Sequence, residues 1–158
     1  DEDPQVIEAP IGRHPSDRKR MTVLEGGRAA RTDAHVVARF ASCDLLRLVL
    51  HTGRTHQIRV HLAHVGHPVV GDPVYHGGGS RRIGGRHRLD AEALERATPR
   101  QALHAAELRF RHPISGAPLH LRSEWPADLR PALALAAGPE TVVADPPLHY
   151  LRFFTEDG

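Results

Sequence analysis

Residues 50–75 read LHTGRTHQIRVHLAHVGHPVVGDPVY, and this stretch decides the fold around it. Its first residues end an apolar run over residues 44–51, which predicts a strand. The Thr-Gly-Arg turn that follows leads into an expected helix over residues 56–65, which Thr55 is placed to cap. Gly66 should end this helix, because glycine commonly follows the last helical turn.

The expected helix has an apolar face and a polar N-terminus. Its apolar face repeats at helical spacing in Ile58, Leu62 and Val65. Free backbone N–H groups at a helix start favour a phosphate, and Arg54, His56 and Gln57 lie there. Arg59 is rotated slightly off the apolar face, so it can flank the core and reach a partly buried site. The spacing alone favours a polar helix start whose buried arginine pairs with a structural carboxylate.

The rest of the chain predicts strands paired as hairpins, with helices inserted between them. Strands are expected over residues 34–40, 44–51, 101–110 and 119–122, and further helices over 90–97 and 127–137. This order indicates an α+β fold with a mixed, mainly antiparallel sheet and flanking helices, rather than a doubly wound sheet. Residues 1–137 form the predicted domain, and residues 138–158 are predicted to be a Pro-rich C-terminal tail.

Composition places the chain among single soluble domains. It has 158 residues, of which 40% are hydrophobic and 25% charged. No apolar run approaches the ~18 residues that a membrane span needs, so we expect no membrane partner. Cys43 is the single cysteine and excludes an internal disulfide, which fits a reducing compartment and hence the cytoplasm.

Basic charge is carried by arginine and gathers away from the acidic ends. The formal net charge is +2, and Lys19 is the single lysine among 21 basic residues. One basic cluster comprises Arg13, Arg18, Lys19 and Arg20, and a second comprises Arg81, Arg82, Arg86 and Arg88. Guanidinium groups match phosphate oxygens and stack on bases, so this distribution favours a polyanion such as RNA. A GC-rich genome would explain the arginine bias equally well.

Three stretches, taken in order, resemble RluA/RluD-type RNA pseudouridine synthases. The first is PIGRHP at residues 10–15 with the basic residues up to Met21, and the second is TGRTHQIRVH at residues 52–61 with GHP and GDPVY after it. The third is RQALHA at residues 100–105 with HPISG at residues 112–116. Three colinear motifs make a far more specific signal than one short pattern. Ala34 departs from the tyrosine common in relatives, which we expect to affect packing more than chemistry.

This resemblance implies the C-terminal half of the pseudouridine synthase catalytic fold. It implies isomerisation of uridine to pseudouridine in RNA, with ribosomal RNA as the expected target and tRNA as the alternative, and without metal or organic cofactor. The uridine is flipped into a pocket, an aspartate attacks the nucleoside, the glycosidic bond breaks, and C5 of the turned uracil rejoins the ribose. By resemblance, Arg59 is the arginine that pairs with that aspartate and keeps it ionised. The residues implied in RNA binding are Arg13, His14, Arg18, Lys19, Arg20, Arg54, Thr55, His56 and Gln57.

The catalytic aspartate is expected outside this chain. In the family it lies in an HRLDxxTSG segment before the PIGRHP-like motif, and a pocket tyrosine also precedes that motif. Only twelve residues precede Arg13, so we expect an inactive fragment that needs the N-terminal half of the catalytic domain. Residues 87–90 spell HRLD, but they follow the Arg59 motif and lack the TSG continuation. Asp90 is therefore expected to cap a helix rather than act as a nucleophile.

Two other readings compete with a fragment of an enzyme. A short RNA-binding module could keep the basic surface without the chemistry, although the aromatic content of 4% argues against a base-stacking platform. Thirteen histidines suggest a metal site, with His61 and His64 one helical turn apart. No HExxH motif or cysteine pair accompanies them, so no metal is expected. As a fragment, the chain should expose apolar residues of its 34–50 hairpin and of its 101–110 strand.

Overall fold

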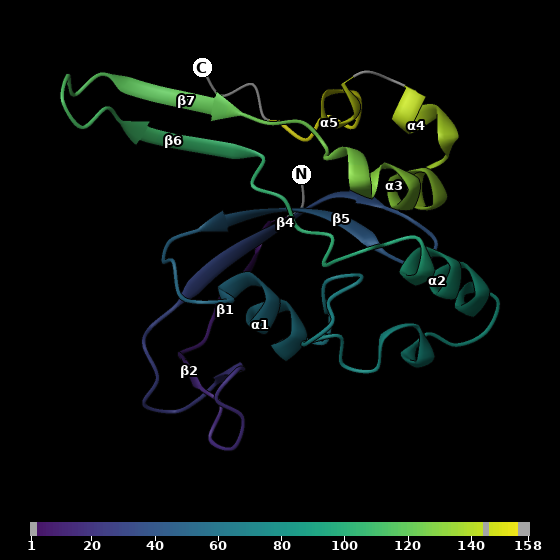
Figure 1. The fold of residues 1–158 in the computed structure, drawn as a ribbon, viewed down its shortest axis with the longest axis horizontal. Coiled ribbons are helices and arrows are strands. Elements are labelled where there is room, and N and C mark those ends of the chain that lie inside the picture. Colours follow the sequence, from purple (N-terminus) through teal and green to yellow (C-terminus); the bar gives the residue numbers. More distant parts are fainter. Residues whose placement is uncertain (1–2, 144–145, 155–158) are drawn as a thin grey trace.

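Antiparallel sheets and helices alternate along the chain in the expected α+β arrangement (Figure 1). The computed structural model describes residues 3–143 and 146–154, and every strand pairing within these ranges is antiparallel. The main sheet has the order β1–β4–β5. Two separate hairpins accompany it: β2–β3 lies between β1 and β4 in the sequence, and β6–β7 follows β5 and the helices after it. None of the helices in the described ranges is long and apolar enough to cross a membrane.

The main sheet contains the hairpin that the sequence predicts. Its strands are β1 (Gln5–Glu8), β4 (Arg31–Arg39) and β5 (Asp44–Leu50). The backbone N–H of Phe40 donates to the carbonyl oxygen of Cys43 at 2.9 Å and closes the β4–β5 turn. β4 begins three residues earlier than predicted because its first residues pair on both sides: Thr32 lies between Ile7 and Leu50.

Helix α1 (Gln57–His64) packs against one face of this sheet (Figure 1). Leu62 is buried there with Ile7 and Val69, and the partly buried Ile58 and Val65 pack on the same cluster, as their spacing predicts. The end of the helix is also as expected. Gly66, at φ +87°, donates to the carbonyl oxygen of Ala63 at 3.1 Å, and His67 donates to that of Leu62 at 2.8 Å, which is a Schellman closure.

The start of α1 corrects one prediction. Thr55 is exposed and does not cap the helix; the N-cap is His56, whose φ of 56° lies in the left-handed region. No side chain caps the helix in the usual way. The amide oxygen of Gln57 accepts the backbone N–H of Arg54 at 3.0 Å instead, so the turn is held from within the helix.

The second side of α1 packs on the short hairpin formed by β2 (Ile11–Arg13) and β3 (Met21–Val23). Val60 of the helix is buried with Ile11, Ala30 and Tyr75, and Met21 and Val23 lie against this cluster. The helix is therefore wedged between the sheet and the β2–β3 hairpin. This placement brings the predicted basic segment of residues 13–20 next to the helix that carries Arg59.

Beyond residue 75 the chain is helical before it returns to a hairpin. Its elements are a 3-10 helix (Gly79–Arg82), α2 (His87–Arg96), β6 (Glu107–Arg111), β7 (Pro118–Arg122), a second 3-10 helix (Ala127–Leu129) and α3 (Arg130–Ala137). α2 begins before Asp90, which lies exposed in its first turn and is not the cap. The ion pair between Arg88 and Glu92, at 2.9 Å, supports this earlier start.

Strand β6 is shorter than predicted, β7 begins one residue earlier than predicted, and the last segment contains two short helices. Residues 101–106 belong to no strand, although the N–H of Ala102 donates to the carbonyl oxygen of Val70 at 2.8 Å and the carbonyl oxygen of Ala106 accepts the N–H of Ser123 at 2.8 Å. Within the predicted tail, α4 (Pro139–Val143) and α5 (Pro147–Tyr150) are helical. Leu148 is 1% exposed, so this segment contributes to the packed structure.

Apolar side chains are exposed on the two hairpins where the sequence leads us to expect them. Val36 and Val49 of β4–β5 are 40% and 41% exposed. On β6–β7, Leu108 pairs with Leu121 and Phe110 pairs with Leu119, so the four side chains share one face. The opposite face carries the charged residues Glu107, Arg109, Arg111, His120 and Arg122. Figure 1 shows this two-stranded hairpin extending away from the main sheet.

Candidate active site

Arg59 forms a buried ion pair with Asp72. Its Nε and Nη2 donate to the two carboxylate oxygens at 2.6 Å and 2.8 Å, and the two side chains are 11% and 0% exposed. The charged hydrogen bonds of this pair raise the pKa of Arg59. Arg59 therefore pairs with Asp72, the aspartate of the GDPVY segment. This agrees with the reading in which the buried arginine pairs with a structural carboxylate.

The loop around Asp72 holds the carboxylate in place. Oδ1 of Asp72 also accepts the backbone N–H groups of Val74 at 2.8 Å and of Tyr75 at 3.0 Å. Burial pushes the pKa of Asp72 upward, but the hydrogen bonds from Arg59 and from these two backbone groups outweigh it and hold the pKa below its usual value. Gly71 precedes it at φ +72°, where a Cβ would collide with the Thr98 side chain, so glycine is required.

Tyr75 joins Arg59 to His56 and to the β2–β3 hairpin. The guanidinium carbon of Arg59 lies 4.9 Å from the centre of the Tyr75 ring, and that of Arg20 lies 5.6 Å from it. The Tyr75 hydroxyl accepts the N–H of Met21 at 2.9 Å and forms a second hydrogen bond, of 2.8 Å, with Nδ1 of His56. Burial, and after it the charge of Arg59, lowers the pKa of His56.

Gln57 ties the start of α1 to the sheet. Its amide oxygen accepts from Thr52 Oγ1 at 2.7 Å, and its amide nitrogen donates to the carbonyl oxygen of Arg31 at 2.9 Å and to Thr32 Oγ1 at 3.0 Å. Thr32 in turn bonds Nδ1 of His61 at 2.9 Å. Gln57 is 3% exposed. Sequence reasoning grouped Gln57 with the RNA-binding residues and did not find this role, because nothing in its spacing identifies a partner.

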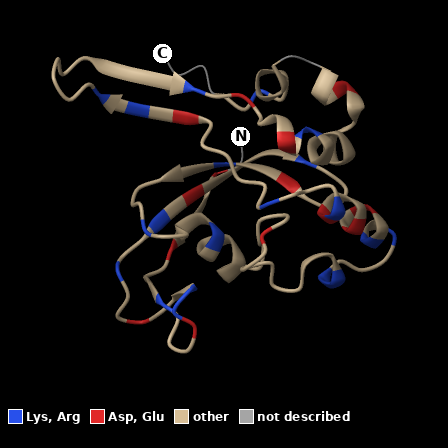
Figure 2. Ribbon diagram, viewed as in Figure 1, with Lys and Arg blue, Asp and Glu red and all other residues tan. Residues whose placement is uncertain are grey.

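The predicted basic residues separate into two groups. Arg20 and His56 meet Arg59 around Tyr75. The others lie nearer the surface: Arg13, Arg18, Lys19 and Thr55 are exposed, His14 and Arg54 are partly buried. Nδ1 of His14 accepts the N–H of Asp17 at 3.2 Å, and Arg54 Nε donates to the carbonyl oxygen of Ala29 at 2.9 Å. Figure 2 shows basic residues gathered at the β2–β3 hairpin, below α1.

A pocket of about 260 Å³ opens between this basic hairpin and α1. Its lining residues come from β2–β3, α1 and the GDPVY segment and are His14, Arg20, Met21, Thr22, Val23, Val60, Ala63, His64 and Tyr75. Tyr75 is therefore shared between the pocket wall and the Arg59 cluster. The pocket joins cationic side chains to an aromatic ring, which suits an anionic or nucleotide-like group.

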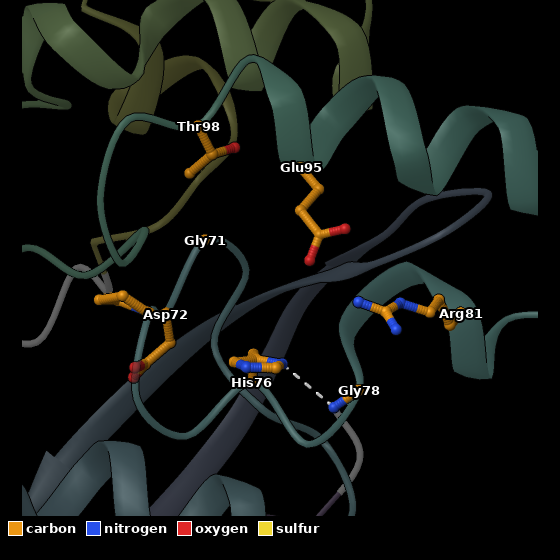
Figure 3. Close-up of a pocket in the computed structure, with 8 residues that line it drawn as sticks. Gly71, Asp72, His76, Gly78, Arg81, Glu95 and Thr98 are labelled. Carbon is orange, nitrogen blue, oxygen red and sulfur yellow. Dashed lines mark hydrogen bonds between the residues drawn. The ribbon is translucent and has the colours of Figure 1, made fainter.

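A second pocket, of about 310 Å³, lies on the other side of Asp72. Figure 3 shows Glu95 of α2 and Arg81 of the first 3-10 helix reaching into it, with Asp72 and His76 opposite. Glu95 is engaged by Ser80, whose hydroxyl donates to it at 2.6 Å. No group of three or more His, Cys, Asp or Glu side chains that could hold a metal ion occurs in the part of the chain that the structure describes.

Comparison with known proteins agrees with the motifs. The model of the RNA pseudouridylate synthase family matches residues 2–64. "Ribosomal large subunit pseudouridine synthase D" of Nitrosomonas europaea is 46% identical over 145 residues, which is 89% of this chain and 39% of that protein. The protein of the same name from Escherichia coli K12 is 46% identical over 124 residues, or 78% of this chain and 37% of that protein. The chain thus spans about two fifths of the length of these curated relatives.

A solved structure supports the same assignment. "Human RNA Pseudouridylate Synthase Domain Containing 1" superposes with a TM-score of 0.57 at 27% identity, covering 97% of this chain and 61% of that one. The matched family model includes Arg59 and the basic hairpin, and the alignment with the human structure includes nearly the whole chain. These matches relate the chain to RNA pseudouridine synthases, in agreement with its resemblance to the RluA/RluD type.

Proposed function

We propose that this chain is the C-terminal part of the catalytic domain of an RNA pseudouridine synthase that acts on ribosomal RNA in the cytoplasm. The observation that carries the proposal is the buried Arg59, held between Asp72 and Tyr75 next to a cationic pocket. Relatives named for the large ribosomal subunit support ribosomal RNA as the target. No cofactor enters the proposal, because isomerisation of uridine needs no oxidant or group donor.

The proposed reaction moves one bond within the nucleotide. The bond between ribose C1′ and uracil N1 breaks, the uracil turns, and a bond forms between C1′ and C5. N1 gains a proton and C5 loses one, so the product has the composition of the substrate. Arg59 has the chemistry to keep a catalytic aspartate ionised, since an adjacent cation lowers a carboxylate pKa. That aspartate would come from the N-terminal half of the domain, the protein partner that we propose.

RNA is proposed to cross the basic hairpin and reach the pocket at Tyr75. Arg13, Arg18 and Lys19 are exposed and available for phosphate contacts. His14 and Arg20 line the pocket itself. Arg54, Thr55 and His56 would contact the RNA from the start of α1, while Gln57 would act through the turn that it holds.

A fusion protein tests this proposal directly. The N-terminal remainder of the Nitrosomonas europaea relative is joined to this chain, and tritium release is measured from ribosomal RNA labelled at uridine C5. We expect release from the fusion, no release from the chain alone, and loss of release in the fusion with Arg59→Ala. A fusion with Asp90→Asn serves as control, because Asp90 is exposed on α2 far along the chain from the motif.

The outcomes separate the two readings of the chain. A folded fusion that releases no tritium, together with retained RNA binding by the chain, would favour a binding module without catalysis. Release from the chain alone would contradict the proposed need for an aspartate in another segment. Loss of RNA affinity on changing Arg13 and Arg18 to Ser, with weaker salt dependence of binding, is expected under either reading.

A further inference from the structure

We infer that Asp72 is a positioning residue of the catalytic site, which aims Arg59 so that its remaining guanidinium edge faces the catalytic carboxylate. This inference rests on the proposed function and assigns a role to a residue outside the predicted site. The geometry points to Asp72 because it fixes Arg59 through two hydrogen bonds at once, at 2.6 Å and 2.8 Å. Bidentate pairing sets the plane of a guanidinium as well as its distance.

The pairing uses one edge of Arg59 and leaves the other available. Nε and Nη2 donate to Asp72, and no hydrogen bond to Nη1 occurs within residues 3–143 and 146–154. Asp72 itself is fully buried, whereas the Arg59 side chain retains 11% of its exposure. The exposed part of Arg59 can therefore receive a second carboxylate without breaking the first pair. A guanidinium has five N–H donors, enough for both.

Asp72 makes more hydrogen bonds within its loop than pairing with Arg59 requires. Its Oδ1 accepts two backbone N–H groups, from Val74 and Tyr75, in addition to the bond with Arg59. Tyr75 then supplies the ring against which the guanidinium of Arg59 lies. Residues 72–75 thus fix both the Asp72 carboxylate and the Tyr75 ring. Each of these groups contacts the guanidinium of Arg59.

Loss of this support should affect the chemical step more than substrate binding. Asp72 contacts Arg59 but does not line the basic pocket. In the fusion protein, we expect Asp72→Asn to lower kcat by about 10- to 100-fold with little change in KM, because displacing a catalytic group by about 1 Å costs on that order. A loss of folded protein would instead reduce the amount of active enzyme and leave the pH dependence unchanged.

The pH profile gives a readout that a purely structural role would not move. The groups around Arg59 are Asp72, Tyr75 and His56, with Arg20 also at the Tyr75 ring. In Asp72→Asn, the positive charge of Arg59 is no longer balanced, so the pKa of the catalytic aspartate should fall. The acidic limb of the kcat profile should therefore shift to lower pH while the plateau drops. Asp90→Asn, the same chemical change on an exposed residue, should alter neither.

The experiment compares four fusion proteins: unchanged, Asp72→Asn, Arg59→Lys and the double variant. If Asp72 acts through Arg59, the double variant should be no slower than Arg59→Lys alone. Full activity of Asp72→Asn in an active fusion would overturn the inference and leave the proposed function intact. An inactive unchanged fusion would instead mean that the proposed function has failed.

A second measurement covers the case in which Asp72→Asn does not fold. The Nε proton of Arg59 is observed by ¹⁵N NMR in the unchanged fusion and assigned by its absence in Arg59→Lys. Slow exchange with water, which is expected of a buried pair, supports the inference. Rapid exchange would mean that Arg59 leaves Asp72 when the domain is complete, and would overturn it.

Discussion

The side-chain amide of Gln57 connects the start of α1, the Thr52 turn and strand β4. Both of its polar atoms are used: the oxygen accepts two hydrogen bonds and the nitrogen donates two. The chain of contacts continues through Thr32 to His61, whose Nε2 donates to the carbonyl oxygen of Ala9 at 2.9 Å. Because these groups are buried, a missing partner leaves unsatisfied polar atoms without water to replace it.

Replacing Gln57 with Ala should therefore destabilise the chain. We expect the free energy of unfolding to fall by about 2–4 kcal/mol, as several buried polar groups lose their partners. Thermal or urea unfolding followed by circular dichroism measures this, with Gln5→Ala on the exposed part of β1 as the control. A variant of unchanged stability that binds RNA more weakly would favour direct contact of Gln57 with RNA over a role in the turn.

The sequence predicted part of this arrangement and missed the rest for a definite reason. Helical spacing placed Arg59 beside the core, because the orientation of side chains on a helix follows from the backbone. Its partner Asp72 lies thirteen residues later in an irregular loop. The path of such a loop depends on tertiary contacts, here between Gly71 and Thr98, which no periodic pattern records. The sequence allowed a structural carboxylate as the partner of Arg59, but it did not indicate which one.

At the scale of elements, strands β4 and β5 are joined by charged side chains as well as by their backbones. Asp33 of β4 accepts hydrogen bonds from Arg31 at 2.9 Å and from His51, beyond β5, at 2.8 Å. The hydrogen bond from Arg31 lowers the pKa of Asp33 to about 2, against the opposing effect of burial, and the bond from His51 adds to it. The ionised carboxylate therefore contributes to the stability of this hairpin.

This pKa predicts the direction of a pH effect. The folded pKa of about 2 lies below the usual value of 3.8, so the contribution of Asp33 is complete above about pH 4 and is lost as the pH falls towards 2. We expect the melting temperature to fall less between about pH 5 and pH 2.5 in Asp33→Asn than in the unchanged chain. Asp72 contributes in the same direction, so part of the fall should persist. Equal falls in the two proteins would contradict the assignment, and Asp90→Asn is the matched control.

Elements with strong local signals were predicted well, and their ends less so. The β4–β5 hairpin and the C-terminal end of α1 follow from apolar patterning and from Gly66. The predicted start of α1 was wrong: Thr55 is a residue type that often caps helices, but here the turn is stabilised by Gln57. Likewise, aspartate is a common capping residue, but α2 already begins at His87, before Asp90. A side chain that is suited to a cap competes with other contacts that sequence alone does not reveal.

At the scale of the whole molecule, the β6–β7 hairpin has an apolar face that the described part of the chain leaves exposed. Leu108 and Leu121 are paired across the strands and are 57% and 53% exposed, with Phe110 at 39%. A two-stranded hairpin gains little stability on its own, and its apolar side normally packs on other elements. In these relatives more than half of the length lies outside the matched region, which leaves room there for such elements. The same surface should make the chain by itself prone to associate.

A double substitution tests whether this face is accessible in solution. We expect Leu108→Ser with Leu121→Ser to reduce the fluorescence of an apolar dye bound to the chain by about half, since it removes the paired centre of the face. Arg109→Ser, on the opposite face of the same hairpin, should leave dye binding unchanged. Light scattering should show less self-association in the double variant than in either control. Equal dye binding in all three proteins would mean that the dye binds elsewhere and that this apolar face is not accessible in solution.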